Sequence, residues 1–250
     1  MFPLVHYFVN RKICENTDNL LALGGIFPDL AASAGMDRNA AHTMGKDFYN
    51  WCRNNAPEGL SLARGIISHG ISPHCVDYYA DEYWPGYRKG WCFMQGEPYM
   101  EQIAAVTRLP QDLIWWKGHN FVEISYELLT EEKYPGIRQG LIAALEDQDA
   151  IQQASSLIAA YSGLDQNNLR AALNNAPNIF AIHELTPLAL AEKQNNAFMV
   201  RHKVMDADVE GIARLFCRMR DDLRAGYDSF FEQLIKKTGM AMSGYQDTTA

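Results

Sequence analysis

Apolar residues recur every three or four positions along most of the chain, whereas strict alternation of apolar and polar residues is rare. This spacing places apolar side chains on one face of a helix, so the pattern predicts an all-α protein. The clearest stripe, over residues 209–234, predicts one long helix packed on the core. No internal repeat or linker interrupts the pattern. We therefore expect residues 1–250 to form a single helical domain, with residues 124–240 as a helical packing region.

In the first half of the chain, the ends of the predicted helices are better defined. Three helices are predicted, at residues 38–53, 57–72 and 112–130. Pro73 should end the second of them, because proline lacks the amide hydrogen that continues a helix. Gly24, Gly25 and Pro28 interrupt the helical pattern just before Asp29. The sequence therefore predicts a turn that carries this carboxylate.

The helical pattern disappears between residues 74 and 98, where aromatic residues are dense. A loop of this length is either a binding segment or an excursion packed on its own side chains, and both interpretations stay open. Aromatic rings can stack on a base, enclose a quaternary ammonium or contact lipid, and an arginine can contact phosphate. The substrate-binding candidates are Tyr83, Trp84, Tyr87 and Arg88.

Composition narrows the function classes. The formal net charge of −8 argues against a grip on duplex nucleic acid or an anionic membrane, because both depend on clustered Lys and Arg. The sequence contains no apolar run of about eighteen residues, so it predicts no transmembrane segment. The N-terminus lacks a secretory-signal pattern and the five cysteines form no CxxC pair, so we expect a cytoplasmic protein, or a secreted one if the sequence is a mature form.

Histidine and carboxylate residues carry the candidate chemistry. His119 and Glu123 lie four apart on one helix face, which is the geometry of a metal clamp or of a buried hydrogen-bonded pair. Imidazole with carboxylate, without clustered cysteine, suits zinc, manganese or iron at a catalytic site. His183 and His202 have no partner pattern and are assigned to structure or solvent. The candidate ligands are His6, Asp29, His42, His69, His74, Asp77, His119 and Glu123. This set exceeds the needs of one ion and would fill two or three sites, and adjacent ions activate water for attack on phosphorus.

The order of these residues resembles the zinc-dependent phospholipase C family, whose all-helical fold is shared with single-strand-specific zinc nucleases. The resemblance covers residues 6–123 and rests on an early His6, the GGIFPD turn with Asp29, His42, the SHG segment with His69, His74 with Asp77, and GHNFVE with His119 and Glu123. It implies a single-domain fold of the phospholipase C and zinc nuclease type, with two or three Zn²⁺ ions, or Mn²⁺ or Fe in their place.

The resemblance also implies a role for each ligand. His6 would serve one metal, a second would take Asp29, His42 and His69, and a third His74, His119 and Glu123. Asp77 would bridge two metals, and Asp29 would also orient the nucleophile as the catalytic carboxylate. Family members commonly place an Asp one turn after the histidine that aligns with His69, whereas Pro73 stands there in this chain. Asp77 then either reaches the metals from the loop or the bridge is missing.

The implied function is that of a phospholipase C-like, metal-dependent phosphoesterase. A metal-activated hydroxide would attack a phosphodiester or phosphomonoester, and the substrate would be a small phosphoester or a phospholipid. Two alternatives stay open. One is a single-strand nuclease of the same fold, and the other is a non-catalytic metal-binding helical scaffold.

Overall fold

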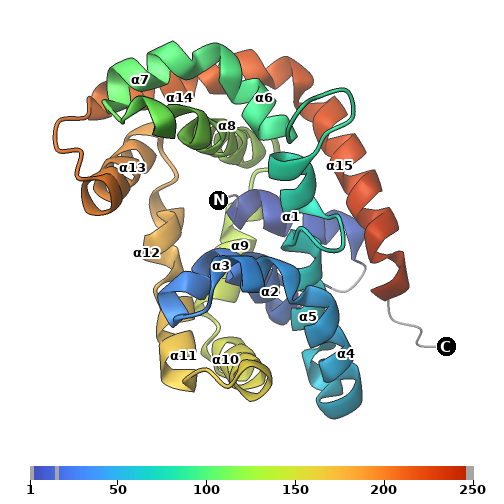
Figure 1. Ribbon diagram of the computed structural model, residues 1–250. Helices are drawn as coiled ribbons and strands as arrows, with labels where there is room; N and C mark the ends of the chain where they lie inside the picture. The colour runs from blue at the N-terminus through green and yellow to red at the C-terminus, as the bar shows by residue number, and fades with distance from the viewer. Residues whose placement is uncertain (1–2, 15–16, 246–250) are drawn as a thin grey trace.

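The computed structural model describes residues 3–14 and 17–245, and within those ranges the chain is helical with no strand (Figure 1). The all-α expectation is confirmed. The helices are α1 (Pro3–Ile13), α2 (Asn19–Leu30), α3 (Arg38–Thr43), α4 (Gly45–Asn55), α5 (Leu60–His69), α6 (Trp91–Gly96), α7 (Met100–Thr107), α8 (Gln111–Lys133), α9 (Ile137–Glu146), α10 (Gln148–Ser162), α11 (Gln166–Asn174), α12 (Ala176–Phe180), α13 (Pro187–His202), α14 (Val209–Leu223) and α15 (Tyr227–Met242). None of them is long and apolar enough to span a membrane.

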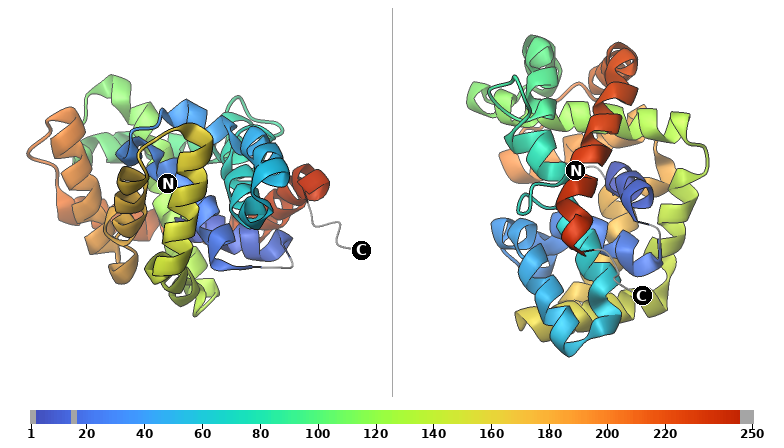
Figure 2. Two further views of the ribbon diagram at one scale, coloured as in Figure 1. Left: turned by 90° about the horizontal axis from the view of Figure 1, so that it is seen from below. Right: turned by 90° about the vertical axis from the view of Figure 1, so that its right-hand side faces the viewer.

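Two clusters of buried apolar residues form the core. One draws on α2, α4, α5, α9, α10 and α11, and the other on α8, α14 and α15. Figure 1 shows these helices as a lower and an upper group, with α1 between them. α1 serves both, because Leu4 and Tyr7 belong to the first cluster and Val5 and Phe8 to the second. α15 runs down one side of the molecule from the upper group towards α5 (Figure 2).

The crossing of α2 and α5 depends on glycine. A Cβ atom at Gly24 would collide with the Leu62 carbonyl oxygen, and one at Gly65 would collide with the Leu21 carbonyl oxygen. Contrary to the predicted turn, α2 continues through Gly24 and Pro28 to Leu30. Packing against α5 outweighs the low helix propensity of glycine and proline. The carboxylate of Asp29 therefore projects from the last turn of a helix and not from a loop.

The other helix predictions are confirmed with changed boundaries. Helix α8 matches the 112–130 prediction closely. The predicted 38–53 helix is divided into α3 and α4 at Met44, and the 209–234 stripe is divided by a 3₁₀ turn at Arg224–Gly226. The predicted 57–72 helix starts as a 3₁₀ turn and ends at His69, before Pro73.

The aromatic segment is more ordered than a loop. It contains a π-helical turn at Tyr78–Glu82 and then α6. Trp84 is only 4% exposed and its ring lies 5.2 Å from that of Phe230, while Trp91 stacks on Phe230 at 5.0 Å. These contacts agree with the packed-excursion interpretation, because the aromatic side chains fasten the segment to α15.

Candidate metal centre

Five of the predicted ligands meet where α1, α2, α3, α5 and the turn before the π-helix come together, and we call them the first group. Asp77 lies at its centre: Oδ1 is 3.3 Å from Nε2 of His6, and Oδ2 is 3.2 Å from Nε2 of both His42 and His69. Asp29 completes the group, with Oδ1 3.9 Å from Nε2 of His42. Four separate helices and one turn thus direct their side chains to one point.

Backbone carbonyls orient two of these imidazoles. Nδ1 of His42 lies 2.7 Å from the Arg38 carbonyl oxygen, and Nδ1 of His69 lies 2.7 Å from the Gly25 carbonyl oxygen. A carbonyl oxygen can only accept a hydrogen bond, so each Nδ1 carries the hydrogen and each Nε2 faces Asp77. This arrangement is characteristic of metal-binding histidines, whose second nitrogen is held by an outer partner.

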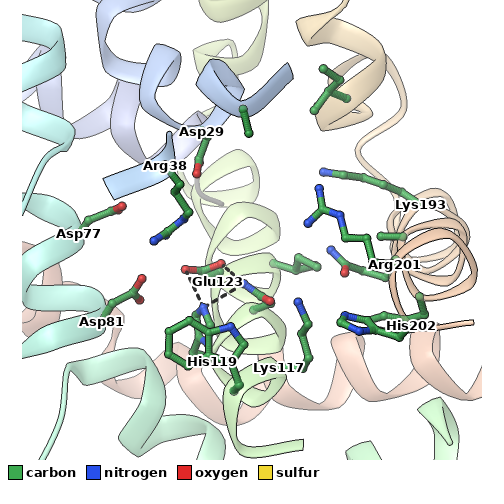
Figure 3. Close-up of a pocket in the computed structure, with 18 of the residues that line it drawn as sticks. Asp29, Arg38, Asp77, Asp81, Lys117, His119, Glu123, Lys193, Arg201 and His202 are labelled. Atoms are coloured by element: carbon green, nitrogen blue, oxygen red, sulfur yellow. Dashed lines mark hydrogen bonds and ion pairs between the residues drawn. The ribbon is translucent and has the colours of Figure 1, made fainter. Parts of the chain in front are cut away.

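A second group consists of Asp81, His119 and Glu123, with one ligand atom from each within 4.8 Å of the others. Nε2 of His119 lies 4.0 Å from Oε1 of Glu123 on the same face of α8. The Asn120 amide donates a hydrogen bond of 2.9 Å to Glu123 and lies 3.1 Å from Nε2 of His119 (Figure 3). The predicted His119 and Glu123 pair is therefore part of a larger polar cluster.

Asp81 takes the place that the resemblance assigned to His74. His74 is exposed, its ring stacks on Tyr78 at 3.6 Å, and it belongs to neither group. The correction follows from the π-helical turn, which begins after Asp77 and buries Asp81 while His74 stays outside. Asp77 and Asp81 lie one turn apart, so consecutive carboxylates serve the two groups. Sequence reasoning missed Asp81, whose four-residue spacing from Asp77 is a usable signal only where the segment is helical.

Burial and neighbouring charges set the protonation of the groups. Burial alone would raise the pKa of the Asp77 carboxyl, but the three imidazoles of the first group hold it well below its usual range. Burial, followed by the charge of Glu123, raises the pKa of Asp81 well above its usual range. Burial lowers the pKa of both His6 and His119 to about 4. These two imidazoles are thus neutral at pH 7, which is the form that binds metal.

Two observations indicate that these residues can hold a metal ion. Nε2 of His42 and Nε2 of His69 lie 3.3 Å apart, and two nitrogen lone pairs at that distance repel unless a proton or a cation lies between them. Oδ1 of Asp81 is buried and has no hydrogen-bond partner within the described part of the chain. Buried polar atoms of this kind call for an ion or another partner. The donor set suits zinc, manganese or iron alike.

Both groups open into one cavity of about 380 Å³. Its acidic side carries Asp29, Asp77, Asp81, His119 and Glu123. Figure 3 shows the opposite side, where basic side chains of α13 and α8 point inward: Lys193, Arg201, His202 and Lys117. Helix α13 brings His202, which the sequence assigned to structure or solvent, into the cavity lining. Lys193, Arg201 and His202 were missed because α13 lies far along the chain from the ligands, whereas Lys117 lies only two residues before His119.

The substrate-binding candidates lie elsewhere. None of Tyr83, Trp84, Tyr87 and Arg88 lines the cavity. Burial of the Trp84 ring excludes it from stacking on a ligand, and the Arg88 guanidinium pairs with Glu97 and lies over the Trp115 ring. Trp84 packs on Phe230 of α15 and Arg88 lies over Trp115 of α8, so neither side chain lines the cavity.

No family model matches the chain, and neither a curated protein nor a solved structure matches it. The likeness to zinc-dependent phospholipase C therefore stays a prediction that rests on the order and placement of its ligands.

Proposed function

We propose that the protein is a metal-dependent phosphoesterase. The proposal rests on one observation above all: two groups of imidazole and carboxylate ligands, to which Asp77 and Asp81 belong, meet at one side of a single cavity, which five of the eight residues line. His6, Asp29, His42, His69 and Asp77 would hold metal in the first group. Asp81, His119 and Glu123 would hold it in the second. Metal ions in such sites act as Lewis acids that activate water and offset charge on phosphoryl oxygens.

Asp29 is the protein's own candidate for handling the proton. Its side chain is 11% exposed, lines the cavity and touches the edge of the first group. A carboxylate there can orient a water molecule and accept its proton as the water oxygen bonds to phosphorus and the ester oxygen leaves. The cavity also suits the substrate, because Lys117 and Lys193 provide positive charge for a phosphate that the carboxylates would repel.

Elemental analysis and hydrolysis together test the function. Protein purified without chelator should carry at least two equivalents of zinc, manganese or iron. It should hydrolyse an activated aryl phosphomonoester or phosphodiester, lose the activity with chelator and regain it with metal. Less than about one equivalent after reconstitution would overturn the proposal.

A wider set of substrates separates the remaining alternatives. Besides the aryl phosphoesters, it includes a phosphatidylcholine dispersion and single-stranded oligonucleotides, each tested with zinc, manganese and iron. Headgroup release supports a phospholipase and nucleotide release a nuclease. Full metal occupancy without turnover on any substrate favours the non-catalytic scaffold.

A further inference from the structure

Four basic side chains line the cavity, and no carboxylate of the described residues lies within ion-pair distance of them: Arg38, Lys117, Lys193 and Arg201. None of them forms an ion pair with another described residue, whereas elsewhere Arg138, Arg214 and Arg224 are paired with carboxylates. In a chain of net charge −8 that pairs several of its surface arginines, four cations without an ion pair gathered at one cavity are a distinct feature. They indicate an anion that is not part of the protein.

Helix α13 presents two of these cations on one face. Lys193 and Arg201 are two four-residue steps apart, with Ala197 between them, and all three line the cavity. Thr186 caps the start of the helix, because its hydroxyl accepts a hydrogen bond from the Ala189 amide. Nearer its end, the buried Phe198 ring anchors the helix in the core. A rigid helix face holds the two charges in place before a ligand arrives, which lowers the entropic cost of binding.

Partial burial makes the two lysines of the cavity more receptive to an anion. Lys117 and Lys193 are half-buried, and burial lowers the pKa of Lys193 to about 8. His202 adds a further donor site, because its Nε2 atom is buried and has no hydrogen-bond partner among the described residues. Charged and polar groups withdrawn from water without a partner carry a desolvation cost that a bound anion would offset.

We propose that this basic wall, formed by Lys117, Lys193, Arg201 and His202, binds a second phosphate group of the substrate. The inference rests on the proposed function, in which the metal-binding side holds the phosphoryl group that reacts. Carboxylates dominate that side, so a second anion of the same molecule is attracted to the basic wall. The substrate class is then a small bisphosphorylated molecule, and a cavity of about 380 Å³ lies in the range that such ligands occupy.

The same wall disfavours a phosphocholine headgroup. Recognition of a quaternary ammonium needs aromatic faces or carboxylates around the cation. Here the charged residues that face the ligand groups across the cavity are cations, and of the exposed aromatic residues only Trp116 lines it within the described part of the chain, whereas Tyr83 and Tyr87 do not. Like charges placed together oppose binding, so a bisphosphate should be preferred over a choline phosphate ester.

The test compares glucose 1,6-bisphosphate with glucose 6-phosphate on metal-loaded protein. Calorimetry should show that the bisphosphate binds at least about tenfold more tightly than the monophosphate, and the double variant Lys193→Gln/Arg201→Gln should lose this preference. Arg214→Gln is the matched control, because its side chain is 68% exposed and lies on α14 outside the cavity. It should bind like the wild-type protein.

Binding is measured separately from turnover, so the two proposals can fail independently. Equal binding of the two sugars by the wild-type protein, or a preference that survives in the double variant, overturns the basic-wall inference whatever the hydrolytic activity. Absence of hydrolysis by protein that still prefers the bisphosphate overturns the proposed function alone. A preference of kcat/KM for the bisphosphate that disappears in the double variant supports both.

Discussion

Oδ2 of Asp77 lies 3.2 Å from Nε2 of His69, although α5 ends at His69 and Pro73 separates the two residues along the chain. Pro73 occupies the position where the resemblance predicted a carboxylate. The chain turns after Pro73 and returns to the end of α5, so Asp77 reaches the three imidazoles from outside the helix. Its two oxygens contact different histidines, so this carboxylate would be the one to bridge two cations if both were bound.

Asp77→Asn tests this bridge. The amide keeps the size of the side chain but removes the charge and one acceptor oxygen, so the variant should lose at least one metal equivalent by elemental analysis. Glu82→Gln is the matched control, because Glu82 is exposed and pairs only with Lys89. It should retain the wild-type metal content. Equal metal content in both variants would show that Asp77 holds no ion.

The second group predicts a non-additive result. Asp81→Asn and His119→Ala should each remove the same ion, so the double variant should lose no more metal than either single variant. The metal-dependent increase in melting temperature should shrink in step, because binding to the native state adds to the free energy of unfolding. His74→Ala is the control and should leave metal content unchanged. Metal loss in that control would favour the assignment that the resemblance implied.

Much of the site could be predicted from the type and order of the residues in the sequence. Seven of the eight predicted ligands lie in the two groups, because imidazole and carboxylate at helical spacing can be recognised in a sequence. Asp81 was missed because its segment was predicted as a loop, where a four-residue spacing from Asp77 has no structural meaning, whereas the structure forms a π-helical turn there. The α13 part of the basic wall was missed because the packing of α13 on α14 is a tertiary contact, and no local pattern joins Lys193 to His119.

The fold shows the same division between local and long-range information. Periodicity predicted helices throughout, and α8 in particular. A turn was predicted before Asp29 because Gly24 and Pro28 are poor helix formers in isolation. The structure uses Gly24 for close contact with α5, and that requirement cannot be inferred without knowing which helix is the neighbour.

Gly65→Ala should disturb this contact. The added methyl group would collide with the Leu21 carbonyl oxygen, which belongs to the backbone and cannot turn aside. Overpacking of this kind costs about 1–3 kcal/mol, and it should also weaken metal binding because α2 carries Asp29 and α5 carries His69. Thermal unfolding and metal titration measure the two effects. Gly226→Ala is the control, since a Cβ atom there meets nothing within 4 Å. A Gly65 variant as stable as this control would contradict the packing argument.

Glu127 caps the helix that carries His6. Its two carboxyl oxygens accept hydrogen bonds from the backbone amides of Leu4 at 3.2 Å and Val5 at 3.0 Å. Burial raises the pKa of Glu127 to about 7, against 4.5 for an exposed glutamate, although the two backbone hydrogen bonds act in the opposite direction. The folded protein therefore holds this proton more tightly than the unfolded chain does.

The sign of the pH dependence follows from that raised pKa. The stabilising contribution of the bound proton is fully present below pH 4.5 and is lost as the pH rises through about 7. The free energy of unfolding of the wild-type protein, relative to Glu127→Gln, should fall between pH 5 and pH 8 by on the order of 3 kcal/mol. Denaturant unfolding with chelator present measures it without metal release. A difference that does not change with pH would show that Glu127 does not titrate in this range.

Asp29→Asn separates proton handling from metal binding. The amide keeps one oxygen that can ligate metal but cannot accept a proton from water, so kcat should fall by about a hundredfold or more while KM changes little. Metal analysis of the same preparation is essential, because Asp29 also touches the first group. Asp112→Asn, at an exposed position in the first turn of α8, should keep wild-type kinetics. If kcat falls only in proportion to lost metal, Asp29 is a ligand and another group takes the proton. If kcat is unchanged at full occupancy, the carboxylate has no part in the reaction.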